Sequence, residues 1–152
     1  MYRATSQLIE QYYQDLIIFA VLTAIAFIML TVLIIISGIM MRKHQYRNRS
    51  ICLGLGLFFL IAFIWCAVKL NGYIQDYDYV VNKDFKYITG IVLDYASGSS
   101  DDNGEVTYGW PIVQDTITGE RISLNVRDSV KQNGEYSFVY LPNSKIAQII
   151  NY

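Results

Sequence analysis

The chain has few of the residues on which most enzymes depend. Charged residues make up only 16% of its 152 residues, and it holds two cysteines, two prolines and one histidine. Soluble domains are typically about 25% charged. Hydrophobic residues make up 53% of the chain and are concentrated in residues 16–41 and 51–70. This composition excludes a large soluble enzyme, a two-domain α/β protein and a disordered chain.

The cysteines and the histidine lie outside the polar C-terminal part. Cys52 and Cys66 would be about 21 Å apart along a helix, so they cannot form a disulfide with each other. We interpret both as helix-packing residues, with an intermolecular link or a lipid attachment as the alternatives. Because His44 is the sole histidine and no cysteine follows Cys66, we predict no metal site and no Ser-His or Cys-His nucleophile in the C-terminal part.

Catalytic motifs are also missing. The sequence contains no Gly-x-Ser-x-Gly, Ser-x-x-Lys or phosphate-loop pattern. Residues 101–105 read Asp-Asp-Asn-Gly-Glu, but a calcium loop with Gly104 at position 6 would begin at Ser99 and end at Trp110, where acids are needed. We therefore predict a solvated loop there, and no catalytic residue, cofactor or metal. Carboxylates for glycosidase chemistry remain available, without a spacing that singles out two of them: Asp94, Asp115, Glu120 and Glu135.

The two apolar runs predict a pair of membrane-spanning helices. Residues 16–41 carry no charge and would form a helix of about 39 Å, which exceeds the roughly 30 Å hydrocarbon core. A signal peptide explains this run less well, because the run is too long and only Arg3 precedes it as a positive charge. Residues 51–70 form the second span, and Lys69 at its end can reach the headgroups. The short connection, residues 42–50, forces an antiparallel hairpin.

The connection carries four basic residues and no acid, namely Arg42, Lys43, Arg47 and Arg49. The positive-inside rule therefore places it in the cytoplasm of a bacterial cell, with residues 1–15 and the C-terminal part outside the cytoplasmic membrane. Binding of anionic lipid headgroups is a compatible second role for these four residues. From Asn71 onward eleven acids face six bases, which argues against a nucleic-acid partner.

The C-terminal part predicts a stalk followed by a small β-domain. Tyr73, Tyr77 and Val80 have near-helical spacing, so residues 71–85 are expected to form a juxtamembrane stalk or helix. Residues 86–152 alternate short Val-, Ile-, Thr- and Tyr-rich segments with turns. Five strands are expected, at residues 87–95, 105–113, 121–126, 135–141 and 145–150. Pro111 predicts an edge strand or a bulge.

The resulting fold class is a membrane α+β protein. A two-helix transmembrane hairpin is expected to precede a small antiparallel β-barrel or sandwich of about five strands. The alternation of apolar residues predicts its core: Ile91, Leu93, Val106, Tyr108, Trp110, Ile112, Ile122, Leu124, Phe138, Tyr140, Ile146 and Ile149.

The order of motifs in this part resembles a known family. The motifs are Thr-Gly-Ile-Val at 89–92, Tyr-Gly-Trp-Pro-Ile-Val at 108–113, Thr-Gly-Glu-Arg-Ile at 118–122, Gly134, and Tyr-Leu-Pro-Asn-Ser-Lys-Ile-Ala at 140–147. They are similar to a bacterial membrane-anchored family, grouped as a domain of unknown function, in which a transmembrane segment precedes a small β-domain. Lys145 stands where that family often has proline. The resemblance covers residues 87–150 and implies a fold, without an activity or a site.

Only the aromatic residues of the sequence indicate a role for the protein. Tyrosine and tryptophan are favoured at protein interfaces, and Tyr95, Tyr136 and Tyr152 are predicted to form a partner-binding patch. We expect a non-enzymatic protein whose outer β-domain binds a membrane or extracytoplasmic protein. It would act as an accessory subunit of a membrane complex or as an immunity protein against a secreted toxin or bacteriocin. The alternatives are a homo-oligomeric channel or pore component and a small cell-envelope hydrolase.

Overall fold

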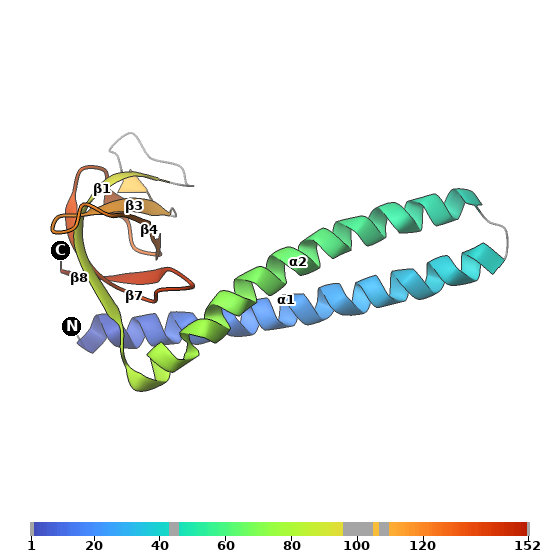
Figure 1. Cartoon of the computed structure of the whole chain (residues 1–152), viewed down its shortest axis with the longest axis horizontal. Helices are drawn as coiled ribbons and strands as arrows, with labels where there is room; N and C mark the ends of the chain where they lie inside the picture. The colour runs from blue at the N-terminus through green and yellow to red at the C-terminus, as the bar shows by residue number, and fades with distance from the viewer. Residues whose placement is uncertain (1, 43–45, 96–104, 107–109, 152) are drawn as a thin grey trace. The chain divides into compact units, whose positions relative to one another are not determined.

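The computed structural model describes residues 2–42, 46–95, 105–106 and 110–151. Two helices, α1 (Tyr2–Arg42) and α2 (Tyr46–Asn82), are followed by strands (Figure 1). The strands are β1 (Lys86–Tyr95), β2 (Glu105–Val106), β3 (Pro111–Asp115), β4 (Arg121–Ser123), β5 (Asn125–Val126), β6 (Val130–Lys131), β7 (Glu135–Tyr140) and β8 (Ile146–Asn151). The chain divides into two units. One is residues 14–72, and the other combines residues 1–13 with residues 73–152.

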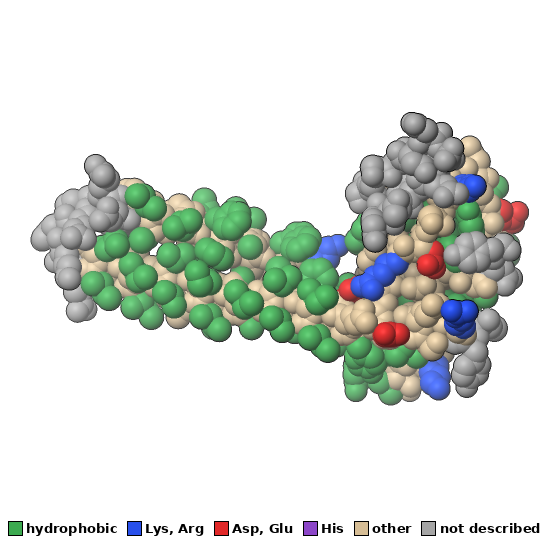
Figure 2. All heavy atoms as spheres, turned by 180° about the vertical axis from the view of Figure 1, so that it is seen from behind, with side chains coloured by type: hydrophobic (Ala, Val, Ile, Leu, Met, Phe, Trp, Pro, Cys, Tyr) green, Lys and Arg blue, Asp and Glu red, His purple; other side chains and the backbone are tan. Residues whose placement is uncertain are grey.

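The first unit is the pair of helices. Both are long and apolar enough to cross a membrane by length and composition, and only 6% of their most apolar stretches is buried within the protein. Figure 2 shows hydrophobic side chains over the visible face of both helices. Aromatic rings connect α1 to α2, with Phe19 centred 5.9 Å from Trp65 and Phe27 centred 6.0 Å from Phe63. Two apolar helices that bury so little of their surface are consistent with a membrane protein.

Polar groups within this unit are satisfied locally. The hydroxyls of Thr23 and Thr31 donate to the carbonyls of Phe19 and Phe27, one turn back on the same helix. These threonine hydroxyls therefore need no partner from the other helix. Both cysteines are free thiols, with Cys66 buried and Cys52 3.9 Å from the Met40 sulfur.

The second unit is built on a six-stranded sheet in the order β4-β3-β1-β7-β8-β5. Four of the five neighbouring pairs are antiparallel, but β5 pairs parallel with β8 through Asn125 opposite Ile146 and Val126 opposite Ala147. The expected antiparallel barrel or sandwich is therefore wrong. Among the described strands the sheet is mixed and stays open, with β4 and β5 at its edges. Residues 121–126, expected as one strand, form the two short strands β4 and β5, and β5 makes the parallel pair.

The remaining strand expectations differ in detail. Among the described residues of the segment 105–115, Glu105–Val106 and Pro111–Asp115 form strands, and the first of these pairs with the unpredicted β6. Pro111 does not lie on an edge strand, since β3 pairs with both β1 and β4. It is instead the first residue of its strand, a position that tolerates a missing N–H donor. The irregularity lies opposite, between Val92 and Asp94 of β1.

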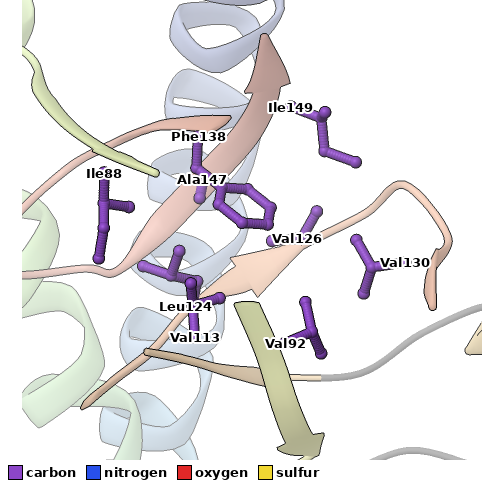
Figure 3. Packing of buried hydrophobic residues seen from close by; sticks show 9 residues of the cluster. All are labelled: Ile88, Val92, Val113, Leu124, Val126, Val130, Phe138, Ala147 and Ile149. Atoms are coloured by element: carbon purple, nitrogen blue, oxygen red, sulfur yellow. The ribbon is translucent and has the colours of Figure 1, made fainter. Parts of the chain in front are cut away.

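The hydrophobic core packs against one face of the sheet. Its cluster consists of Ile88, Val92, Val113, Leu124, Val126, Val130, Phe138, Ala147 and Ile149 (Figure 3). Leu124, Phe138, Ile146 and Ile149 are buried as expected. The expected phase of β1 and β3 is wrong, because Val92 and Val113 point into the core while Ile91 is exposed and Ile112 is only half-buried. Tyr108 and the side chain of Val106 lie outside what the structure describes.

Helical structure extends well beyond the two apolar runs. Residues 2–13 belong to α1, and residues 73–82 belong to α2, so the segment expected as a stalk or a helix is helical as far as Asn82. In the N-terminal turns of α1 the buried residues repeat at helical spacing: Ala4, Leu8, Gln11 and Tyr12. In the last turns of α2 the buried residues are Tyr73, Asp76 and Val80. These two stripes pack within the same unit as the sheet.

Candidate functional site: a polar junction of helix ends and sheet

The most unusual side chain of the β-domain unit is a fully buried carboxylate. Asp76 lies on the last turns of α2 and has no solvent exposure. Its Oδ1 accepts hydrogen bonds from the backbone N–H of Asn143 at 3.0 Å and from the side-chain amide of Asn143 at 2.8 Å. Its Oδ2 accepts from the backbone N–H and the hydroxyl of Ser144, both at 2.6 Å. Four donors therefore converge on one carboxylate, which compensates for its loss of water.

The donors come from the turn between β7 and β8. In this turn the Leu141 N–H donates to the Ile146 carbonyl, and the Lys145 N–H donates to the Leu141 carbonyl. Lys145 adopts a φ of 61°, which brings the chain back toward β8. The turn thus points two consecutive N–H groups toward α2, as anion-binding turns do. In this protein the anion is the carboxylate of Asp76, so the contact holds the end of α2 against the sheet.

A second buried contact fastens α1 to the same sheet. Gln148 lies on β8 between Ala147 and Ile149, so it points to the face opposite the hydrophobic core. Its side-chain amide donates to the Gln11 side-chain oxygen at 2.7 Å, and both residues are buried. The Gln11 Nε2 is buried without a hydrogen-bond partner among the described residues. This amide pair specifies where α1 meets β8, because a shift would leave more buried polar groups unpaired.

A third contact joins the two helix ends to each other. The buried Tyr12 hydroxyl donates to the Tyr73 carbonyl at 2.8 Å, and the two rings lie 6.0 Å apart. Together with the contacts of Asp76 and Gln11, it forms what we call the polar junction: Gln11, Tyr12, Tyr73, Asp76, Asn143, Ser144 and Gln148. Each of its side chains is engaged with protein, so the junction is suited to hold elements in place rather than to bind a substrate.

The predicted partner-binding tyrosines have structural contacts. Tyr95 and Tyr136 are half-buried and pack against the hydrophobic core. The Tyr95 hydroxyl donates to the Val130 carbonyl at 3.0 Å, and burial raises the pKa of this hydroxyl above its usual value of 10.0. The Tyr136 hydroxyl accepts a hydrogen bond from the Lys131 N–H at 3.0 Å. Tyr152 lies outside the described residues.

The other predicted residues are placed separately. Arg42 ends α1, while Arg47 and Arg49 lie in the first turn of α2; their side chains, and the whole of Lys43, are outside the described part of the chain. Residues 101–104 are also outside it. Among the side chains that the structure describes, no group of three or more His, Cys, Asp or Glu could hold a metal ion.

Of the four carboxylates considered for hydrolysis, Asp115 is engaged in its own turn. Its carboxylate accepts from the Ile117 N–H at 2.7 Å and from the Thr118 hydroxyl at 3.0 Å. The Ile117 N–H is the main reason why the pKa of Asp115 lies below its usual 3.8. Asp94 accepts from the backbone N–H of Tyr95. Both groups therefore act locally as turn and strand-end acceptors.

Exposed apolar residues offer a different surface. Ile117, at the tip of the β3–β4 hairpin, is 89% exposed. On α2 the side chains of Ile74, Tyr77 and Val81 are each at least half exposed. Sequence reasoning expected strands at residues 105–113 and 121–126 but missed the exposed Ile117 between them, although an isoleucine flanked by Thr116 and Thr118 was a usable signal.

Comparison with protein-family models, with curated proteins and with solved structures gives no match for this chain. Function therefore has to be argued from the junction and from the surfaces around it.

Proposed function

We propose that this chain is a membrane-anchored, non-enzymatic binding protein. In this proposal α1 and α2 cross a bacterial cytoplasmic membrane, and the β-domain binds a membrane or extracytoplasmic protein. The anchoring is supported by the exposed apolar surface of both helices. It is also supported by their length, since 41 and 37 residues correspond to about 61 and 55 Å at 1.5 Å per residue. A hydrocarbon core of roughly 30 Å leaves part of each helix outside the bilayer.

The polar junction is the observation that supports placing both helix ends on the same side of the membrane. Residues 11 and 12 of α1 and residues 73 and 76 of α2 share buried hydrogen bonds with each other or with the β-domain. Chain ends that share such contacts must lie in one aqueous compartment, which supports two crossings. The basic residues of the connection, Arg42, Lys43, Arg47 and Arg49, favour the cytoplasm for the opposite end. The β-domain would then lie outside.

The junction also supports a role in protein binding. A sheet that is joined to both helix ends by hydrogen bonds is ordered before a partner binds, which lowers the entropy cost of docking. The hairpin tip at Ile117 and the exposed Tyr87 offer apolar contact points of the kind that anchor interfaces. This arrangement suits an accessory subunit and an immunity protein equally. The resemblance to membrane-anchored proteins with a small β-domain agrees with it.

The test is site-specific photocrosslinking in intact cells. A photoreactive phenylalanine analogue would replace Ile117 or Tyr87, with the buried Phe138 as the matched negative position. The proposal predicts one membrane or extracytoplasmic protein crosslinked from the exposed positions and absent from position 138. That crosslink should also weaken when Thr118, beside Ile117, is changed to a charged residue. Cytoplasmic proteins captured from position 117, or no protein captured from either exposed position, would contradict the proposal.

A further inference from the structure

One short segment joins the two opposite edges of the six-stranded sheet. Strand β4 forms one edge and β5 forms the other, yet the two strands are consecutive in the chain and only Leu124 separates them. The N–H of Leu124 donates to the Pro111 carbonyl at the start of β3. The N–H of Asn125 donates to the Lys145 carbonyl just before β8. We call residues 121–126 the clasp, because they connect the two edges.

The β5 half of the clasp has the shorter pairing. It pairs with β8 through Asn125 and Val126, and this is the only parallel pair among the strands that the structure describes. The β4 half pairs with β3 through three residues in antiparallel register. Parallel pairing is slightly less stable per residue. The side chain of Val126 also holds β5, because it is buried in the hydrophobic core (Figure 3).

The turn that supports β5 is the same turn that Asp76 holds. Asn143 and Ser144 donate four hydrogen bonds to the Asp76 carboxylate. Lys145 is the next residue, and its carbonyl accepts the Asn125 N–H at 2.7 Å. Lys145 has a φ of 61°, which a residue with a side chain keeps only when its surroundings impose it. Loss of the carboxylate contact removes one of these constraints, and the Lys145 carbonyl can then turn away from Asn125.

We propose that the end of α2, the β7–β8 turn and β5 open and close as one unit. When Asp76 leaves the turn, β5 leaves the edge of β8, while β4 keeps the other half of the clasp on β3. Burial of Val126 makes the closed form the major one. Opening bares the backbone of Ile146 and Ala147 at the sheet edge.

This coupling links the position of α2 to the surface that the β-domain presents. Each of its contacts lies within the unit that contains residues 73–152. The inference therefore goes beyond the proposed function and does not depend on membrane crossing or on a partner protein.

Amide hydrogen exchange, followed by NMR of the full chain in detergent micelles, tests whether the two contacts open together. Val126→Ala removes burial that β5 loses on opening, so opening becomes easier. We expect the N–H of Ser144, which donates to Asp76, to exchange at least about fivefold faster in this variant. Val113→Ala is the matched control, because Val113 is a buried valine of the same core on β3 and stays in place when β5 opens. It should leave the Ser144 rate within about twofold of the parent.

Coupling is reciprocal, so the reverse experiment has to agree. Asp76→Asn keeps the size of the side chain but replaces one acceptor oxygen, and it should speed exchange of the Asn125 N–H. Asp78→Asn, at an exposed position of the same helix, should not.

The valine comparison decides the proposal even if Asp76→Asn fails to fold. Faster exchange at Ser144 in both valine variants would mean that the turn opens only when the whole domain unfolds. Faster exchange in neither variant would mean that β5 and the turn open separately. Either result, or an unchanged Asn125 rate in a folded Asp76→Asn variant, would overturn the proposal.

Discussion

At the residue scale, Asp76 connects one helix to the sheet through a single side chain. Its two oxygens accept four hydrogen bonds from Asn143 and Ser144 at 2.6–3.0 Å, and no part of the residue reaches solvent. Removing the carboxylate leaves four donors without an acceptor in a closed site. Unsatisfied buried donors cost about 1–3 kcal/mol each, although some can turn toward water after relaxation.

We therefore predict that Asp76→Ala lowers the free energy of unfolding by about 3 kcal/mol or more. This loss is expected even though alanine is the better helix former. Urea unfolding of the full chain in detergent, followed by tyrosine and tryptophan fluorescence, measures it. Asp78→Ala is the control, because Asp78 is exposed two residues further along α2 and should stay within about 0.5 kcal/mol of the parent. Equal effects at both positions would contradict this account.

The amide pair of Gln11 and Gln148 should show strong coupling. Either single change to leucine leaves one buried amide unpaired and should cost about 1–3 kcal/mol. The double variant removes both amides, and the buried Gln11 Nε2 that has no partner among the described residues disappears with them. We predict that the double variant is more stable than either single variant. A double-mutant cycle from unfolding curves measures this, and simple additivity would refute the contact.

At the element scale, strand positions were predicted better than strand faces. The sequence placed strands near residues 87–95, 135–141 and 145–150, where β1, β7 and β8 occur. The core face of β1 was predicted wrongly, with Ile91 and Leu93 inward in place of Val92. Apolar residues occupy both faces of this strand, and its register with β3 is interrupted at Leu93. In β3 the expected core face was assigned from Trp110 and Ile112, whereas the residue that faces the core is Val113. Alternation fixes a face only where one face is polar.

Gly90 provides a test of how closely β1 and β3 approach. A Cβ at this position would meet the Gln114 carbonyl oxygen and would lie 2.6 Å from Val113 Cγ1. We predict that Gly90→Ala costs about 2 kcal/mol or more, because the strand pair cannot separate without breaking its ladder. Gly54→Ala is the matched control, since nothing lies within 4 Å of its Cβ and alanine favours a helix. Thermal unfolding of both variants measures this; a neutral Gly90→Ala would contradict the register.

The helix ends show why the junction could not be predicted. Residues 1–15 contain Arg3, Glu10, Asp15 and several glutamines, which read as a polar segment outside a membrane. The buried positions at Ala4, Leu8, Gln11 and Tyr12 have helical spacing, but only two of them are strongly apolar or small. Likewise, Asp76 is one of eleven acids after Asn71, and nothing local marks it as buried. A polar residue becomes part of a core only through partners that are distant in sequence.

At the scale of the whole molecule, composition predicted the two apolar helices and the polar domain after them. It did not predict that the first thirteen residues and residues 73–82 would join the β-domain as one unit. That union is the basis for placing both helix ends in one compartment, and with them the proposed outer location of the domain.

Cysteine labelling in intact bacterial cells tests this central claim most directly. On a background of Cys52→Ala and Cys66→Ala, single cysteines would replace the exposed Ser6 of α1, the exposed Ile117 of the hairpin, and His44 of the connection. With a membrane-impermeant maleimide, the account predicts that positions 6 and 117 react in intact cells, and that position 44 reacts only after permeabilisation. Opposite behaviour of positions 6 and 117 would contradict the shared compartment that the polar junction requires.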